Sequence, residues 1–327
     1  MVRPLGRAVD ALLEASVAGS FSRLGPVVRS SLLGWEDPPP AALRDRVCVV
    51  TGATSGIGAA LATGMARLGA EVHLVGRDEE KLRSSIERTT EQVPGARLTP
   101  HRADLGRLAD VNDLAERLAE HTERIDVLAH VAGALVHEEQ RTPDGLELTF
   151  QVHVVAPFLL TSRLLTQLSA SGGGRVLTMS SGGMYTQRLD VAELLDPPHP
   201  FDGTRAYARA KRAQVVLNEE WARRHPRLGV GFHALHPGWV DTPGLSEGLP
   251  GFATRIRAAL RTPEQGADTA LWLSWTPDAR PPGGHFWHDR RRRHTVVAPW
   301  TRTPPGEADR LWETVSRLAD GPEDAPT

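Results

Sequence analysis

Short apolar, β-branched runs alternate with amphipathic stretches through most of the chain, and this alternation limits the folds it can adopt. Such alternation predicts βαβ units, and the continuously apolar runs indicate a sheet covered on both faces. We therefore expect an α/β fold with a doubly wound parallel sheet of about seven strands and helices on both faces. The runs are 47–51, 72–75, 127–131, 175–179 and 230–235; the amphipathic stretches are 57–68, 79–90, 108–122, 146–168, 206–224 and 263–275.

The segments at the two ends lie outside this alternation. Residues 1–40 carry apolar side chains at near-helical spacing, with arginines around them, and end at three consecutive prolines. We expect a helical extension that packs on its own domain or on a second subunit; contact of residues 1–34 with a membrane surface is the less favoured alternative. The main domain is expected over 41–280, followed by a loop-rich extension over 281–327 with a short helix at 307–319.

The composition of the chain narrows the classes of function that it can have. The 327 residues carry a net charge of −2, which argues against a nucleic-acid partner. Cys48 is the only cysteine, so no internal disulfide can form, and this fits a reducing cytoplasmic location. No apolar run is long enough to predict a membrane span. The histidines, among them His285, His288 and His294, show no metal-ligand spacing, so no metal is expected.

A glycine-rich turn joins the first predicted strand to the first helix of the main domain. Its sequence is Thr51-Gly52-Ala53-Thr54-Ser55-Gly56-Ile57-Gly58. Between a strand and a helix, such glycines allow a tight turn and let backbone N–H groups approach a pyrophosphate at the helix N-terminus. The turn predicts a dinucleotide site that includes Thr51, Gly52, Ser55, Gly56, Ile57 and Gly58. A connecting loop without a ligand is the weaker reading.

The end of the second predicted strand bears on which dinucleotide is bound. The run 72–75 is followed by Gly76, Arg77 and Asp78. A carboxylate at the strand end would bind an unmodified ribose 2′-hydroxyl, whereas Arg77 can pair with a 2′-phosphate. We expect NADP(H) to be preferred. NAD(H) stays as the alternative because Asp78 is adjacent, although Asp78 can also cap the following helix.

One scarce residue pair carries acid–base chemistry. Only two lysines and two tyrosines occur in the chain, and Tyr207 lies four positions before Lys211. At this spacing on a helix the two side chains share a face. A phenol ordinarily titrates near ~10, and a neighbouring ammonium favours the phenolate. We expect Lys211 to lower the pKa of Tyr207 so that it exchanges a proton near neutral pH. An ordinary pair on a solvated helix is the alternative.

These motifs together resemble the short-chain dehydrogenase/reductase family, whose fold is of the Rossmann type. The glycine turn, Ser180-Ser181 after a strand, Tyr207-x-x-x-Lys211 and Pro237-Gly238-x-x-x-Thr242 occur in the family's order over about residues 44–277. The segments Ser180-Ser-Gly-Gly-Met184 and His236-Pro-Gly-Trp239-x-Asp-Thr-Pro-Gly244 are similar to the dehydrogenase/reductase member 12 subgroup, near the retinol-dehydrogenase-like branch.

The resemblance implies a role for each matching residue. Tyr207 would exchange the proton, Lys211 would also bind the nicotinamide ribose, and Ser181, with Ser180 as the fallback, would hydrogen-bond the substrate oxygen. The remaining implied cofactor contacts are Asp104, for which a helix cap is the alternative, Leu105, Ala132, Gly133, Pro237, Gly238 and Thr242.

Two positions depart from the family pattern. Where the family has Asn-Asn-Ala-Gly, this chain has His130-Val131-Ala132-Gly133. The asparagine of the family's proton relay is replaced by His153. A neutral imidazole has one donor and one acceptor, so His153 would either sustain a relay that is pH-sensitive near neutrality or be an interior histidine without a catalytic role.

The prediction for function is an NADP(H)-dependent oxidoreductase that interconverts a carbonyl and an alcohol. Residues 243–262 are rich in glycine and proline and are expected to form a lid over the nicotinamide. A lipophilic substrate is expected on the interpretation that Met184, Tyr185, Phe201, Trp239, Leu245 and Phe252 line an apolar pocket; packing in the core or the lid is the alternative for each of them. The alternative is a cofactor-binding regulatory or scaffold protein with weak or lost catalysis; a homo-oligomer is left open.

Overall fold

The computed structural model describes residues 4–320, and its centre is one eight-stranded sheet. The strand order is β3-β2-β1-β4-β5-β6-β7-β8; the first seven strands of this order are parallel and β8 is antiparallel to β7. The expected doubly wound sheet is confirmed. The strands are β1 (Val47–Thr51), β2 (Glu71–Gly76), β3 (Arg97–Arg102), β4 (Val127–His130), β5 (Arg175–Met179), β6 (Gly231–Leu235), β7 (Gly283–His288) and β8 (Arg291–Arg293).

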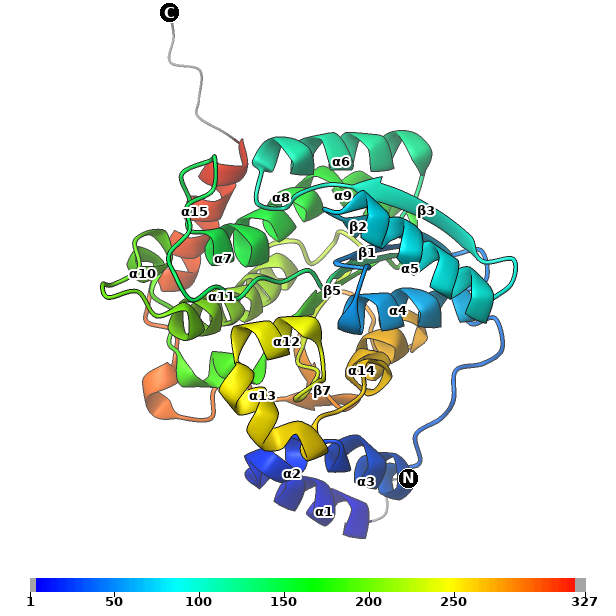
Figure 1. Ribbon diagram of the computed structural model, residues 1–327, viewed down its shortest axis with the longest axis horizontal. Helices are drawn as coiled ribbons and strands as arrows, with labels where there is room; N and C mark the ends of the chain where they lie inside the picture. The colour runs from blue at the N-terminus through cyan, green and yellow to red at the C-terminus, as the bar shows by residue number, and fades with distance from the viewer. Residues whose placement is uncertain (1–3, 321–327) are drawn as a thin grey trace, which may run out of the picture.

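Helices cover both faces of the sheet (Figure 1). On one face lie α4 (Gly56–Arg67), α5 (Glu79–Gln92) and α14 (Pro263–Trp275). On the other face lie α6 (Leu108–His121), α8 (Ala156–Arg163), α9 (Leu165–Ala170), α11 (Gly203–Arg224) and α15 (Glu307–Asp320). The shorter elements are α7 (Leu148–Phe150), η1 (Gln151–Val155), η2 (Gly182–Thr186), α10 (Val191–Leu195), α12 (Pro243–Gly248), α13 (Pro250–Ile256), η3 (Arg257–Ala259) and η4 (Pro299–Thr301).

The central strands are apolar because their side chains pack into two separate cores, one on each face of the sheet. Successive side chains of a strand point to opposite faces, so in β1 the side chain of Val49 enters the core under α6, α8 and α11, whereas Cys48 and Val50 enter the core under α4 and α14. All three side chains are fully buried. The sheet order reverses direction between β1 and β4, and ligands bind at the carboxyl ends of strands at such a point.

Three strands lie where no strand run was recognised. In β3, Pro100 interrupts the run, but β3 is an edge strand, where a proline removes no needed hydrogen bond. The interpretation of 281–305 as loop-rich is wrong for β7 and β8, which extend the sheet. Glycine and histidine residues of β7 and the consecutive arginines of β8 hide the pattern, and charged side chains are tolerated on an exposed edge strand. The predicted helix at 307–319 is confirmed as α15.

The long helix expected over 146–168 is divided. Its first part contains the five-residue π-helical segment η1, and it breaks at Leu164 before α9. Such π-helical insertions are uncommon and are found frequently at functional sites. Here the inserted segment carries His153.

The N-terminal extension packs on its own domain, as one of the sequence alternatives predicted. It forms α1 (Pro4–Ala15), α2 (Val17–Phe21) and α3 (Leu24–Leu33). Buried Arg29 of α3 bonds Asp10 of α1 at 2.8 Å and Asp289 of the β7–β8 turn at 2.5 Å. These helices lie at the lower end of the molecule, below α12 and α13 (Figure 1). Within residues 4–320, no helix has the length and apolar content to cross a bilayer.

Candidate active site

The glycine turn between β1 and α4 is shaped by contacts that exclude side chains. Gly52 has φ +70°, and a Cβ there would lie 2.7 Å from Ala132 Cα. Gly56 has φ +51°, and a Cβ there would lie 2.9 Å from Thr242 Cγ2. Only glycine fits either position without strain. The turn therefore meets two other predicted cofactor segments, the loops after β4 and β6.

Three more residues of this turn have distinct surroundings. Gly58 lies against the turn itself, because a Cβ would come within 2.2 Å of Gly52 O. Ser55 is exposed at the N-terminus of α4, and its hydroxyl forms no cap hydrogen bond. Thr51 is buried, and its Oγ1 accepts hydrogen bonds from the N–H groups of Val131 and Ala132 at 3.0 and 3.2 Å. Thr51 thus ties the turn to the loop after β4, and α4 presents free N–H groups that suit a pyrophosphate.

A polar cavity of about 400 Å³ lies beyond the ends of β2 and β3. Its walls carry three exposed arginines, Arg77, Arg102 and Arg107. Asp78 is not part of this wall: its carboxylate caps α5 by accepting from Lys81 N at 3.0 Å. The helix-cap interpretation of Asp78 is therefore the correct one. Three guanidinium groups suit a phosphate far better than a neutral ribose hydroxyl.

Arg102 and Arg107 were missed by sequence reasoning. Arg102 ends β3, which the sequence did not reveal, so nothing placed it beside Arg77. Asp104 lines the same cavity, and its Oδ1 accepts from Gly106 N at 2.9 Å. Asp104 is not the N-cap of α6, since that position belongs to Arg107. Leu105 is buried in the neighbouring core.

Tyr207 and Lys211 lie one turn apart near the start of α11. The helix begins where Asp202 caps it by accepting from Arg205 N at 3.0 Å. Lys211 Nζ donates to Met179 O at 2.8 Å and lies 5.3 Å from the centre of the Tyr207 ring. Tyr207 is half-buried and Lys211 is buried. The two side chains share one face of α11, as the spacing predicts, and Lys211 on that face contacts the end of β5.

The two serines after β5 point in different directions. Ser180 is buried, and its hydroxyl donates to Lys211 O at 2.9 Å. The Ser181 side chain lies beside Tyr207, whose pKa it lowers, and its Oγ accepts from Gly183 N at 3.3 Å. Ser181 is thus the serine whose side chain can contact a ligand bound next to the Tyr207 hydroxyl.

Burial, rather than the neighbouring charge, dominates the proton affinity of this pair. Desolvation raises the pKa of Tyr207 to about 12, against a smaller lowering from the hydrogen bond with Ser181. Desolvation also lowers the pKa of Lys211 to about 7. The expectation that Lys211 lowers the pKa of Tyr207 is wrong, because burial dominates the shift and the amine has itself lost water and is only partly charged near pH 7. The phenol is protonated at neutral pH.

His153 sits beside the same phenol. Its ring lies edge to face with the Tyr207 ring, with centroids 5.3 Å apart. Its Nε2 is 3.0 Å from Ala134 N and 2.9 Å from Ala134 O, while buried Nδ1 contacts no protein partner. Burial, with a smaller contribution from the Lys211 charge, lowers the pKa of His153 well below its ordinary value. The predicted pH sensitivity near neutrality is therefore wrong: His153 is neutral there.

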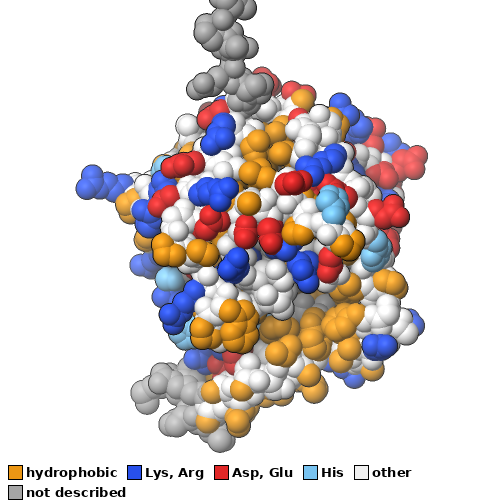
Figure 2. Space-filling model, turned by 90° about the vertical axis from the view of Figure 1, so that its left-hand side faces the viewer, with side chains coloured by type: hydrophobic (Ala, Val, Ile, Leu, Met, Phe, Trp, Pro, Cys, Tyr) orange, Lys and Arg blue, Asp and Glu red, His pale blue; other side chains and the backbone are white. Residues whose placement is uncertain are grey.

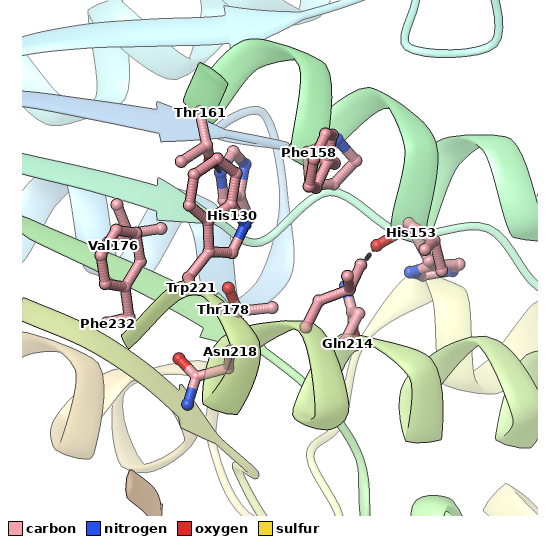
Figure 3. A pocket seen from close by; sticks show the side chains of 13 residues that line it. His130, His153, Phe158, Thr161, Val176, Thr178, Gln214, Asn218, Trp221 and Phe232 are labelled. Atoms are coloured by element: carbon pink, nitrogen blue, oxygen red, sulfur yellow. Dashed lines mark hydrogen bonds between the residues drawn. The ribbon is translucent and has the colours of Figure 1, made fainter. Parts of the chain in front are cut away.

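A small internal cavity, about 20 Å³ and large enough for one water molecule, lies behind this group (Figure 3). His130 lines it, and its Nε2 lies 2.8 Å from Thr161 Oγ1. Gln214 Nε2 donates to His153 O at 2.7 Å, the interaction drawn in Figure 3. Buried His130 Nδ1 and Gln214 Oε1 have no protein partner. The two positions that depart from the family pattern thus border one small cavity.

The loop after β6 is held by a residue that the sequence did not single out. Gly238 has φ +81°, and a Cβ there would lie 2.3 Å from Arg261 Nε. Buried Arg261 donates from Nη1 to Pro237 O at 3.0 Å and to Asp289 Oδ1 at 2.6 Å. Thr242 caps α12 by accepting from Leu245 N at 3.2 Å. Arg261 appeared in the sequence as one arginine among many, and no local pattern marks it.

Phe21 of the N-terminal extension also reaches the site. Its ring lies so close to Gly182, the residue after Ser181, that a Cβ there would be 2.5 Å from the ring. Phe21 O accepts from Trp239 N at 2.8 Å. Among the apolar residues expected at the substrate side, Trp239 stacks edge to face on Phe252 at 5.4 Å. Met184 is fully buried in a core cluster, so the core-packing alternative is the correct one for this residue.

Comparison with known proteins agrees with this geometry. The family model for short chain dehydrogenases matches residues 46–249. Dehydrogenase/reductase SDR family member 12 of Bos taurus is 40% identical over 278 residues, 84% of this chain and 86% of that protein. A Streptomyces sp. (strain C5) protein named as a daunorubicin C-13 ketoreductase, DnrU, is 38% identical over 84% of this chain and 93% of its own length.

A solved structure shows the same arrangement. A short chain dehydrogenase of Escherichia coli CFT073, crystallised in complex with NADPH, superposes with a TM-score of 0.64 at 28% identity, covering 77% of this chain and all of that one. The resemblance to the member 12 subgroup is likewise confirmed. The chain belongs to the short chain dehydrogenase family.

Proposed function

We propose that this protein is an NADP(H)-dependent oxidoreductase that interconverts a carbonyl compound and an alcohol. The observation that supports it most directly is the placement of Tyr207, Ser181 and Lys211 at the carboxyl edge of the sheet, in the same molecule as a glycine turn shaped for a dinucleotide. NADPH, when bound, supplies the hydride from its nicotinamide ring.

The chain's own residues would bind and orient the cofactor. The N–H groups at the start of α4 would receive the pyrophosphate, and Arg77, Arg102 and Arg107 would receive the 2′-phosphate. The related Escherichia coli enzyme was crystallised with NADPH, which supports the same cofactor here. Ala132, Gly133, Pro237 and Gly238 come from the loops on either side of the turn.

Proton transfer would fall to Tyr207. Its pKa of about 12 keeps the phenol protonated at neutral pH, the form that donates a proton to a carbonyl oxygen during reduction. Ser181, which lies beside the phenol, would hold the same oxygen. Lys211, with a pKa of about 7, gains a full charge if a hydroxyl-bearing ribose and a phenolate approach it.

The substrate we propose is lipophilic. Trp239 and Phe252 form an aromatic pair beside the loop after β6, and α12 and α13 follow that loop as the proposed lid. A relative carries the name daunorubicin C-13 ketoreductase, which supports a carbonyl group as the reacting group here. A regulatory or scaffold protein that binds the cofactor without turnover is the alternative, motivated by the replacement of the family's asparagine by His153.

Tyr207→Phe tests the proposal. The substitution keeps the ring but removes the acidic hydroxyl, so turnover of a panel of aldehydes and ketones should fall at least ~1,000-fold while NADPH affinity stays within about twofold. NADPH oxidation measures the first quantity and cofactor fluorescence the second. Retained turnover would remove Tyr207 as the acid, and saturable NADPH binding without any wild-type turnover would favour the scaffold alternative.

The same assay decides the role of His153. If its ring nitrogens relay a proton, His153→Leu should lower kcat by about 10- to 100-fold and leave NADPH affinity unchanged, whereas His153→Asn should restore most of the rate. Equal rates in wild type and both variants would assign His153 to the interior without a catalytic role.

A further inference from the structure

The N-terminal helices expose an apolar outer face. Of the eight exposed large hydrophobic side chains in the described part of the chain, five lie on α1–α3 and a sixth, Phe252, lies on α13. We call this group the outer face; Figure 2 shows hydrophobic side chains gathered over the lower part of the molecule, where these helices lie. The five are Leu12 (72% exposed), Val17, Leu24, Val27 and Leu32.

The outer face is continuous with the proposed lid. Arg23 N, between α2 and α3, donates to Ala259 O at the end of η3, at a distance of 2.9 Å. Phe252 of α13 stacks on Trp239, whose N–H is bonded to Phe21 O. The outer face therefore borders the segment that follows the candidate active site.

The extension cannot bury its outer face by folding back, because its inner face is already fixed. Arg29 is 1% exposed and bonds Asp10, Glu14 and Asp289. Arg293 of β8 adds a second pair to Asp10 at 2.8 Å. Separating the inner face would leave these buried charges without partners, which is strongly unfavourable.

The charges on and beside the outer face are positive. Arg23, Arg255 and Arg257 are exposed and form no ion pair within residues 4–320. The two carboxylates of α1–α3, Asp10 and Glu14, are already paired with arginine. The exposed carboxylates nearest in sequence, Glu36, Asp37 and Glu247, lie outside α1–α3 and α13.

These features favour a lipid surface over a second copy of the chain. A twofold interface through this face would bring the same unpaired arginines together without a carboxylate to neutralise them. An anionic bilayer accepts the aliphatic side chains among its acyl chains and supplies phosphates for the arginines. Short amphipathic helices with an apolar face and a basic rim bind membranes in this way.

We propose that the outer face docks on an anionic bilayer and holds the lid helices at the membrane. A lipophilic carbonyl compound or alcohol would then reach the active site directly from the bilayer; this second statement rests on the proposed function. The docking itself needs no catalytic activity and is tested separately.

Vesicle co-sedimentation of the full-length protein tests the docking. Wild type should bind vesicles of phosphatidylcholine and phosphatidylglycerol mixed at about three to one, and bind pure phosphatidylcholine at least tenfold more weakly. Leu12→Glu/Val27→Glu should lower binding to the anionic vesicles at least ~tenfold. Arg23→Gln/Arg255→Gln/Arg257→Gln should lower it by roughly fivefold for each arginine removed, and less at high salt.

A matched control uses exposed hydrophobic residues elsewhere on the molecule. Val297→Glu/Trp300→Glu changes two such side chains between β8 and α15 and should bind vesicles like wild type. NADPH binding and circular dichroism confirm that each variant is folded.

Three outcomes would overturn the docking: no wild-type binding to either vesicle, equal binding by both double variants, or light scattering that shows a dimer dissociated by Leu12→Glu/Val27→Glu without any vesicle binding. The last would assign the face to a second copy. Vesicle binding without turnover would reject the proposed function and leave the docking intact.

Discussion

The two ends of the predicted cofactor site hold their ionisable groups in opposite ways. At the adenosine end, Arg77, Arg102 and Arg107 are exposed around an open polar cavity. At the catalytic end, Lys211 and His153 are buried, and burial is the largest cause of their pKa shifts.

This difference shows when the sequence around a residue is enough to predict that residue's charge state. An exposed arginine keeps its charge wherever it lies, so its role follows from its residue type and its position in the fold. A buried amine or phenol depends on how much water it has lost, which no local pattern records. The N-terminal extension is likewise held by buried ion pairs. By contrast, the three arginines Arg77, Arg102 and Arg107, which we call the arginine wall, are exposed.

Arg261→Met is expected to have the largest effect on stability. Arg261 is 1% exposed and its guanidinium donates to main-chain carbonyls of Ser20 and Pro237 and to Asp289. Removing it leaves buried acceptors unsatisfied, so the free energy of unfolding should fall by about 3–5 kcal/mol. Urea unfolding followed by fluorescence measures the change.

Arg107→Met is the matched control for this comparison. Arg107 is exposed, with Asp110 at 3.6 Å, so its replacement should change the free energy of unfolding by less than about 1 kcal/mol. Similar losses in the two variants would mean that the buried network does not hold the extension and the loop after β6 together.

Arg77→Ala is expected to have an intermediate effect, which is confined to the affinity for NADPH relative to NADH. Loss of one charge-assisted contact to a 2′-phosphate should weaken NADPH binding by roughly tenfold, or about 1.4 kcal/mol, and leave NADH binding unchanged. The NADPH effect should shrink as salt is added, because the site is exposed. Arg83→Ala, an exposed arginine of α5, is the control. Equal weakening of both cofactors would reject the assignment of the arginine wall.

Lys211→Met is expected to change the pH dependence of stability by a smaller amount. The pKa of Lys211 is lowered by burial to about 7, so between about 7 and its ordinary value the unfolded chain holds a proton that the folded one lacks. Wild-type stability should therefore rise with pH through this window, by at most about 1.4 kcal/mol per unit, relative to the variant. Urea unfolding at pH 7, 8 and 9 measures the difference, and parallel profiles would show that Lys211 stays charged when buried.

The sequence predicted the parallel sheet, its flanking helices and the segments that meet at its carboxyl edge. The glycine turn and the Tyr207–Lys211 pair were found because each depends on local spacing within one element or one turn, whereas Ser181 followed from the resemblance to the family. β3 and β7 were not found, since proline on an edge strand and glycine with histidine in β7 break the apolar pattern. Arg102 was missed with its strand.

Contacts between segments far apart in the chain lie beyond such patterns. Phe21 meets Gly182, and Arg261 joins α2 to the loop after β6 and to the β7–β8 turn. Nothing near Phe21 or Arg261 in the sequence records these partners, because they are defined only once the helices have packed. The sequence also does not show that the Ser180 and Ser181 side chains point in different directions, because their partners are likewise defined only by packing.

The amino-acid sequence alone determined the α/β fold class, the glycine turn and the shared helical face of Tyr207 and Lys211, because strand periodicity, glycine turns and helical spacing are local properties of the chain. Tertiary structure alone decided the protonation states at the catalytic end and the joining of the extension to the site. Proton affinity depends on how much water the whole fold excludes from a group, and that quantity is set by every element packed around it.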